Sequence, residues 1–173
     1  MANWIKKYTI PKDEFEELKE RLLLAIDMIK DEYDTSFANM SHSDYKAGDA
    51  NKIYRPYFIK WIKPYLQDYC QQWRCDSVEV QNVWFAEYLG EDGADFDYHT
   101  HEGSNMSGAL QLLIEDKRNC TVLMHHPIDT DEGDLLLFPA MLPHKSPYVF
   151  DGRKIVIGFN WNMSGSIVHS DIK

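Results

Sequence analysis

The stretch that decides the fold runs from Gly133 to Trp161 and reads "GDLLLFPAMLPHKSPYVFDGRKIVIGFNW". It contains two apolar segments typical of buried strands, "GDLLLFP" and "RKIVIGFNW". A proline-flanked turn between them carries His144. In the second segment every other residue is strongly apolar, and this period of two indicates a strand with one face in the core. The stretch therefore predicts a β-protein with a histidine at a strand end.

The alternation also assigns the two faces of this last strand. The apolar face is expected to pack against helices and consists of Ile155, Ile157, Phe159 and Trp161. The opposite face is expected to point into a barrel and consists of Lys154, Val156, Gly158 and Asn160. A lysine inside a barrel is costly unless an anion meets it, so Lys154 is a candidate anion-binding residue. The alternative is that Lys154 simply reaches water at the strand end. Arg153, on the outer face, is expected to be solvated or paired with an acid.

Strand patterns fill the chain from Ser77 onward, with turn signals every eight to twelve residues. Besides the two segments above, the predicted strands are "SVEVQNVWFAEY", "DFDYHTH", "SGALQLLIE" and "CTVLMHH". Short strands in series, without helices between them, are typical of an antiparallel sandwich or barrel.

Helical patterns fill the first part of the chain. Apolar residues from Lys12 to Lys30 repeat at three- and four-residue steps, which predicts an amphipathic helix. In a second helical segment, "YRPYFIKWIKPYLQDYCQQW", Pro64 predicts a kink or a break into two shorter helices. The polar segment 33–51 between them is expected to be a loop and a candidate substrate lid. We expect a single domain, 1–173, in which helices in 1–75 buttress one face of a β-core in 76–165.

Composition limits the classes of function. The net charge of −10 disfavours nucleic acid as a partner, because phosphate neutralisation supplies much of the affinity for it. The 173 residues contain no apolar run long enough to span a membrane and no signal peptide, so a cytoplasmic location is expected. Cys70, Cys75 and Cys120 are expected to be reduced thiols. An aromatic content of 13% leaves room for a hydrophobic homodimer surface.

The segment "FDYHTHEG", Phe96 to Gly103, carries two histidines two residues apart. On a strand, His99 and His101 would share one face and converge on one point, as two ligands of a metal ion do. His144 offers a third ligand. A β-sandwich binding module without metal is the alternative, with the three histidines as ordinary core or surface residues. The other histidines, His125 and His126 included, are better explained as structural or surface residues.

In this order, these segments resemble the Fe(II)/2-oxoglutarate-dependent oxygenases, in particular a compact phage and bacterial group. The resemblance covers residues 81–162 and rests on "HTH", the "SG" that opens the next strand, "GDLLLFP", His144, and a basic residue ten positions later before "IGFN". It implies a double-stranded β-helix, a squashed jelly-roll barrel of eight antiparallel strands. It also implies hydroxylation of a C–H bond in a peptide or small molecule, using O2 and releasing succinate and CO2. For a phage-encoded protein the location would be the host cytoplasm.

The resemblance also implies roles for single residues. His99, His101 and His144 would be the Fe(II) ligands, and Lys154 would bind the remote carboxylate of 2-oxoglutarate, with the Tyr88 hydroxyl beside it. Side chains alternate between the two faces of each strand, and six residues on the inward faces are predicted to line the pocket: Trp84, Ala86, Gln111, Leu113, Val156 and Asn160. Of these, Trp84, Gln111 and Asn160 are candidates for orienting cosubstrate or substrate, although filling of the barrel explains them equally well.

One position departs from the family pattern. The usual pair is His-x-Asp/Glu, whereas this chain has His101 in the place of the carboxylate. Three imidazoles also suit zinc, copper or nickel. Asp97 or Glu102 could supply a carboxylate if the backbone bends. The alternative family is the metal-binding cupins, which share the fold, and a three-histidine cupin would be a dioxygenase, an isomerase or a non-catalytic metal-binding protein. Lys154 discriminates between the two families, because a cupin has no need of a cation ten residues past its last ligand.

Overall fold

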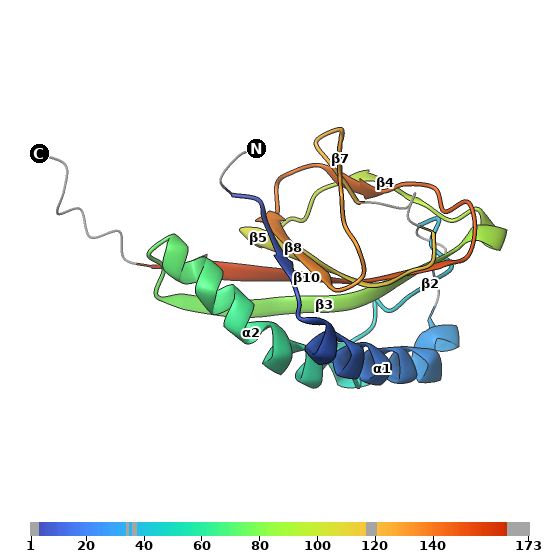
Figure 1. Ribbon diagram of the computed structural model, residues 1–173, viewed down its shortest axis with the longest axis horizontal. Helices are drawn as coiled ribbons and strands as arrows, with labels where there is room; N and C mark the ends of the chain where they lie inside the picture. Colours follow the sequence, from blue (N-terminus) through green and yellow to red (C-terminus); the bar gives the residue numbers. More distant parts are fainter. Residues whose placement is uncertain (1–3, 34, 36–37, 117–120, 166–173) are drawn as a thin grey trace, which may run out of the picture.

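The computed structural model describes residues 4–33, 35, 38–116 and 121–165 and consists mainly of β-strands with two long helices. Figure 1 shows three layers, with the helices on one face of the larger sheet and the smaller sheet on the other. The expected mainly β class with helices on one outer face is therefore confirmed. Cys120, considered above, lies outside the described residues.

Two antiparallel sheets form the β-layers. The larger sheet has the order β1 (Lys6–Thr9), β8 (Asp134–Pro139), β5 (Met106–Ile114), β10 (Arg153–Ser164), β3 (Ser77–Leu89) and β2 (His42–Ser43). The smaller sheet has the order β4 (Phe96–His99), β9 (His144–Ser146), β6 (Thr121–Leu123) and β7 (His126–Ile128). The large sheet thus recruits β1 and β2 from the helical part of the chain, where no strand was expected.

The helices are α1 (Lys12–Ile29) and α2 (Arg55–Gln72), with 3-10 turns η1 (Lys30–Glu32), η2 (Asp49–Asn51) and η3 (Gly90–Asp92). The predicted break at Pro64 is wrong, because α2 continues through it. Ile62 and Leu66, on either side of the proline, are both fully buried in the same core. Packing of both halves outweighs the roughly 3 kcal/mol that an interior proline costs a helix. Within the described chain, no helix combines the length and the apolar character needed to cross a membrane.

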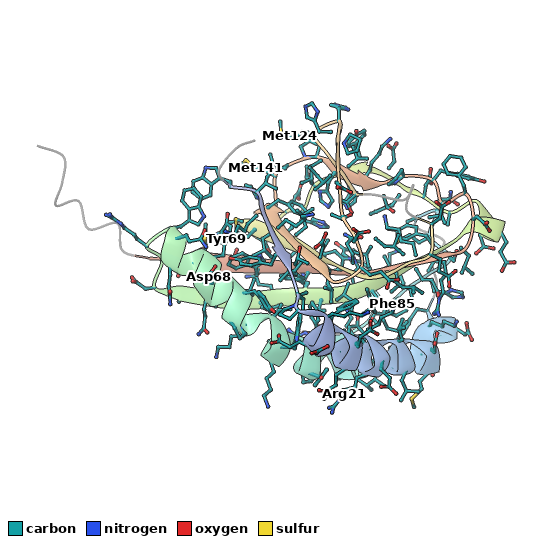
Figure 2. All side chains as sticks on the ribbon, viewed as in Figure 1. Arg21, Asp68, Tyr69, Phe85, Met124 and Met141 are labelled. Atoms are coloured by element: carbon teal, nitrogen blue, oxygen red, sulfur yellow. The ribbon has the colours of Figure 1, made fainter. Side chains whose placement is uncertain are left out.

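The main core lies between the helices and the larger sheet. Its sheet side includes the alternate residues of β10 that were predicted to face the helices, and all four are fully buried: Ile155, Ile157, Phe159 and Trp161. Leu18 and Leu22 of α1 and Phe58 of α2 pack in the same cluster. Figure 2 shows Phe85 of β3 inside this layer and Arg21 on the outer side of α1.

The segment between the helices is anchored to the edge of the larger sheet. Strand β2 pairs with β3, and the buried Asp44 accepts hydrogen bonds from the Phe85 N–H at 2.9 Å and the Tyr54 hydroxyl at 2.8 Å. The buried Lys52 ammonium donates to the Val83 carbonyl at 2.7 Å. Residues 42–54 are therefore fixed by buried polar contacts, whatever role residues 33–51 have as a lid.

Candidate metal centre

Three histidines meet where the smaller sheet opens toward solvent. His99 ends β4, His144 begins β9, and the two lie opposite each other in the antiparallel pair. The prediction that His101 shares a strand with His99 is wrong, because β4 ends at His99. His101 still converges, since its backbone N–H donates to the Ala140 carbonyl at 3.0 Å and ties this loop to the end of β8. The ligand nitrogens all lie within 4.8 Å of one another.

Backbone carbonyls orient two of the three rings. The Nδ1 of His99 lies 2.9 Å from the Asp97 carbonyl oxygen, and the Nδ1 of His144 lies 2.9 Å from that of Leu142. Because a carbonyl only accepts, each Nδ1 carries the hydrogen and each Nε2 keeps its lone pair. Metal-binding histidines are commonly fixed in this way. The Nε2 atoms of His101 and His144 are 3.1 Å apart.

The three imidazoles are held neutral. Burial, followed by the neighbouring His144 and His99 rings, lowers the pKa of His101 to about 3. Burial and His99 lower the pKa of His144 to about 4, and burial also lowers the pKa of His99. Neutral imidazole is the metal-binding form of histidine, so all three lone pairs are available at neutral pH.

The donor set fits a divalent transition metal. Nitrogens at about 2.1 Å from a shared ion lie at most about 4.2 Å apart, so the closest pair already fits and small ring movements bring in the third. Neither Asp97 nor Glu102 belongs to this cluster, and both side chains are exposed. The Asp97 carboxylate accepts from the Tyr98 N–H instead, at 2.7 Å. Among the described residues, the cluster is therefore an all-imidazole set.

A cavity of about 60 Å³ lies between the two sheets, behind the histidines. Lys154 of β10 is fully buried there, and its ammonium donates to the Ser146 hydroxyl at 3.0 Å. The same ammonium lies 5.8 Å from the centre of the Tyr88 ring. Burial raises the pKa of the Tyr88 hydroxyl, which also hydrogen-bonds Ser146, so this hydroxyl stays protonated at neutral pH. The inner end of the cavity thus gathers donors suited to an anion.

Three of the six predicted pocket residues, Trp84, Ala86 and Val156, line this cavity. The other three are absent from its described lining. Gln111 donates to the Thr121 hydroxyl at 3.1 Å, and Asn160 accepts from the Ser107 hydroxyl at 2.8 Å. Leu113 packs against the helix-facing core instead. The pairing of β10 with β5 shifts register between Ile155 and Val156, and this shift turns the Leu113 side chain to the opposite face of the sheet.

A second, outer pocket of about 180 Å³ adjoins the histidines. Its walls are Met40, Tyr45, Trp84 and Phe96, with His99, Thr100 and His101 completing the lining. Sequence reasoning missed the contributions of Met40, Tyr45 and Phe96. The only signal was the predicted lid segment, which contains the first two of them.

Trp84 lines both cavities and contacts the three-histidine cluster. Its ring lies 5.2 Å from that of His101 and 5.1 Å from that of Tyr45, the latter at nearly a right angle. Gly158 on the neighbouring strand gives Trp84 its room, because a β-carbon there would lie 2.5 Å from the indole. Three rings therefore surround that of His101: Trp84 at 5.2 Å, His144 at 4.9 Å and His99 at 5.1 Å between ring centres.

A buried carboxylate on the opposite face of β3 was also missed. Glu87 is fully buried and binds the Arg153 guanidinium, which also donates to Asp27 of α1 at 2.6 Å. The Nδ1 of His42 lies 2.6 Å from the other Glu87 oxygen. The expectation that Arg153 pairs with an acid is confirmed, and this network joins α1, β2, β3 and β10.

No family model matches the sequence, and no curated protein matches it. Solved structures do match. A viral collagen prolyl hydroxylase of Paramecium bursaria Chlorella virus 1, solved as a 2-oxoglutarate complex, superposes with a TM-score of 0.63 over 94% of this chain and 97% of its own, at 13% identity. A Pseudomonas putida prolyl-4-hydroxylase gives 0.64 over 95% and 94%, at 13% identity.

A third match is a Trichoplax adhaerens prolyl hydroxylase bound to a peptide fragment of the hypoxia-inducible factor oxygen degradation domain. It gives a TM-score of 0.66 over 92% of this chain and 84% of its own, at 11% identity. The chain has the fold of these hydroxylases. The double-stranded β-helix that the sequence resemblance implied is therefore confirmed, and the three histidines line the cavity within it.

Proposed function

We propose that the protein is an Fe(II)- and 2-oxoglutarate-dependent dioxygenase that hydroxylates a C–H bond of a peptide or small molecule. Substrate, 2-oxoglutarate and O2 would yield the hydroxylated product, succinate and CO2. One observation carries the proposal: three neutral imidazoles stand at the mouth of a narrow cavity in which a lysine ammonium is fully buried. A dicarboxylate could bind the metal with one end and meet this ammonium with the other.

Each residue of the cavity would have a distinct task. His99, His101 and His144 would hold Fe(II), which when bound supplies the redox chemistry that couples O2 to oxidation of 2-oxoglutarate and substrate. Lys154 would bind the remote carboxylate of 2-oxoglutarate. Ser146 holds the Lys154 ammonium in place, and the protonated Tyr88 hydroxyl beside Ser146 could donate to the same carboxylate. The role of Asn160 in binding stays a prediction, and its amide oxygen accepts from the Ser107 hydroxyl.

The walls of the barrel would protect this chemistry from water. The inner cavity is small, and apolar groups such as Phe138, Ala86 and Val156 form much of its lining. Excluding water strengthens the attraction between Lys154 and a bound carboxylate and limits side reactions. The peptide bound to the Trichoplax hydroxylase supports a peptide as one of the two substrate classes.

The test combines metal analysis with turnover. Protein purified without chelator is analysed for metal, reconstituted with Fe(II), and assayed for succinate released from 2-oxoglutarate, including release uncoupled from any substrate. We expect bound iron and succinate release in the native chain, with release lost in Lys154→Ala while iron binding is kept. Lys63→Ala, a change at an exposed lysine of α2, is the matched control and should behave as the native chain. Iron binding without any succinate would contradict the proposal.

A second candidate is a three-histidine metal protein of the cupin type. The observation in its favour is the donor set itself, which among the described residues contains no carboxylate. Tight binding of zinc, copper or nickel with no affinity for 2-oxoglutarate would support it. Affinity for 2-oxoglutarate that disappears in Lys154→Ala would oppose it, because a cupin has no use for this ammonium.

A further inference from the structure

The outer pocket has a chemical character of its own. Two of its walls are the rings of Tyr45 and Trp84, which pack in a T-shaped contact at 89° to each other with 5.1 Å between ring centres. Phe96 and Met40 add apolar surface. The described residues of its lining include no Asp, Glu, Lys or Arg, and their polar atoms are hydroxyls, imidazoles and an indole N–H. Such a lining offers little to replace the hydration of a charged group.

Contacts within the protein hold the Tyr45 and Trp84 rings, called the aromatic corner below, in place without a ligand. Tyr45 directly follows Ser43 and Asp44, both fully buried, and its N–H bonds the Ser43 hydroxyl at 3.2 Å. Ser43 in turn donates to the Phe85 carbonyl at 2.7 Å. On the other side, Gly158 makes the space that the Trp84 ring fills. A preformed pocket spends less of its binding energy on ordering side chains.

The volume indicates the size of the group that fits. An engineered apolar cavity of about 150 Å³ in another protein is large enough to bind benzene. The outer pocket, at about 180 Å³, therefore accepts one ring or one branched side chain, rather than a nucleoside or a folded segment. The pocket adjoins His99 and His101, so a group seated in it lies next to the metal-binding cluster.

We propose that the outer pocket binds an uncharged ring or apolar side chain of the substrate, stacked on Trp84 and Tyr45. Its role as the substrate subsite rests on the proposed oxygenase function. Its selectivity for uncharged groups rests on the lining alone. The competing occupant is a quaternary ammonium group, which aromatic corners also bind through cation–π attraction.

The test measures binding without turnover. The full chain, with and without zinc as an inert metal, is titrated in 0.15 M salt with benzyl alcohol, with benzylammonium of nearly the same shape, and with tetramethylammonium. This salt concentration limits non-specific attraction of the cations to the acidic chain. We expect saturable binding of benzyl alcohol and, because an unpaired charge resists desolvation, at least roughly tenfold weaker binding of both cations.

Three variants locate the bound probe. Tyr45→Ala removes one wall and should weaken benzyl alcohol binding about fivefold, as expected for loss of one aromatic contact. Tyr45→Phe keeps the ring and should bind as the native chain does. Tyr148→Ala is the matched control, because Tyr148 is 45% exposed, against 44% for Tyr45, and lies outside the described lining of the pocket.

Three outcomes would overturn this inference: no saturable binding of benzyl alcohol, tighter binding of either cation than of benzyl alcohol, or benzyl alcohol binding that Tyr45→Ala leaves unchanged. Failure of the proposed function would look different. In that case succinate release is absent, while the binding titration, which needs neither iron nor 2-oxoglutarate, still reports on the pocket. Succinate release together with no saturable binding of benzyl alcohol would reject the subsite alone.

Discussion

Arg153 and Lys154 are neighbours on β10, but their side chains lie on opposite faces of the sheet and have different kinds of partners. Arg153 lies on the helix side, where Glu87 and Asp27 neutralise it. Lys154 points into the cavity, where its ammonium meets the Ser146 hydroxyl and the Tyr88 ring. The first cation completes a network that joins elements of the fold. The second is held among hydroxyls, an arrangement that suits a ligand carboxylate.

Burial alone therefore does not separate a structural charge from a functional one. The useful distinction is whether another buried group of the protein depends on the charge for its own neutralisation. Glu87 is fully buried and depends on Arg153, so the fold depends on that pair. Lys154 should matter to a bound anion much more than to folding. Five variants compare the two faces of the sheet, beginning with the largest expected effect.

Arg153→Met should destabilise the protein most. It leaves the Glu87 carboxylate buried with only His42 as a partner for charge, and breaking a buried pair on one side costs roughly 3–5 kcal/mol. Urea unfolding measures the loss. The folded fraction of Arg153→Met should keep the native affinity for 2-oxoglutarate. A loss below about 1 kcal/mol would mean that Glu87 is satisfied without Arg153.

Gly158→Ala and Gly108→Ala place the same methyl group on opposite faces of the sheet. At Gly158 the new β-carbon would meet Trp84 at 2.5 Å, and at Gly108 it would meet Phe159 at 2.1 Å. Overpacking should cost each variant about 1–3 kcal/mol. Only Gly158→Ala should weaken zinc binding, measured by competition with a chelating dye, because Trp84 supports His101. Equal zinc affinity in both variants would remove Trp84 from the positioning of this ligand.

Lys154→Met should change stability in the opposite direction. The variant removes a desolvated ammonium and keeps its volume, so the free energy of unfolding should stay level or rise by about 1 kcal/mol. Affinity for 2-oxoglutarate, measured by titration calorimetry, should fall below detection. A clear loss of stability would make Lys154 a structural cation like Arg153 and would end the contrast between them.

Asp27→Asn should have the smallest effect, and the effect should depend on pH. Burial by itself would raise the pKa of Asp27, but hydrogen bonds from Arg153 and Lys30 hold it below its usual value. A lowered pKa adds stability above the unfolded-state value of about 3.9, and this stability is lost as pH falls below it. At pH 7 the variant should lose about 0.5–1 kcal/mol, since the pair is partly exposed. In urea titrations the difference from the native chain should shrink as pH falls below about 3.9 and should vanish once pH is below the lowered pKa of folded Asp27.

Much of this molecule could be predicted because the spacing of apolar residues along one segment is a local property. The faces of β10, the buried β8 and the helix α1 follow from apolar spacing within one segment. The three histidines could be brought together because each lies at or near a strand end.

The rest depended on contacts between distant segments. The register shift beside Ile155 reversed Leu113, and no single-strand pattern reports a register shift. Strand β1 has only four residues and exists because it covers the edge of β8. His42 and Tyr45 lie in a polar stretch whose anchors, Asp44 and Lys52, look like ordinary surface charges until the sheet is present.

The position of β10 in the larger sheet has a consequence for synthesis of the chain. Strands β3 and β5 do not pair with each other, and both pair with β10, which is made last of the three. A ribosome needs about 4–15 s to make the roughly 75 residues from the end of β3 to the end of β10. During that interval neither β3 nor β5 has its β10 partner, so each displays an edge with unsatisfied backbone groups. A chain stalled before Arg153 is therefore the form most prone to aggregate and most dependent on chaperones.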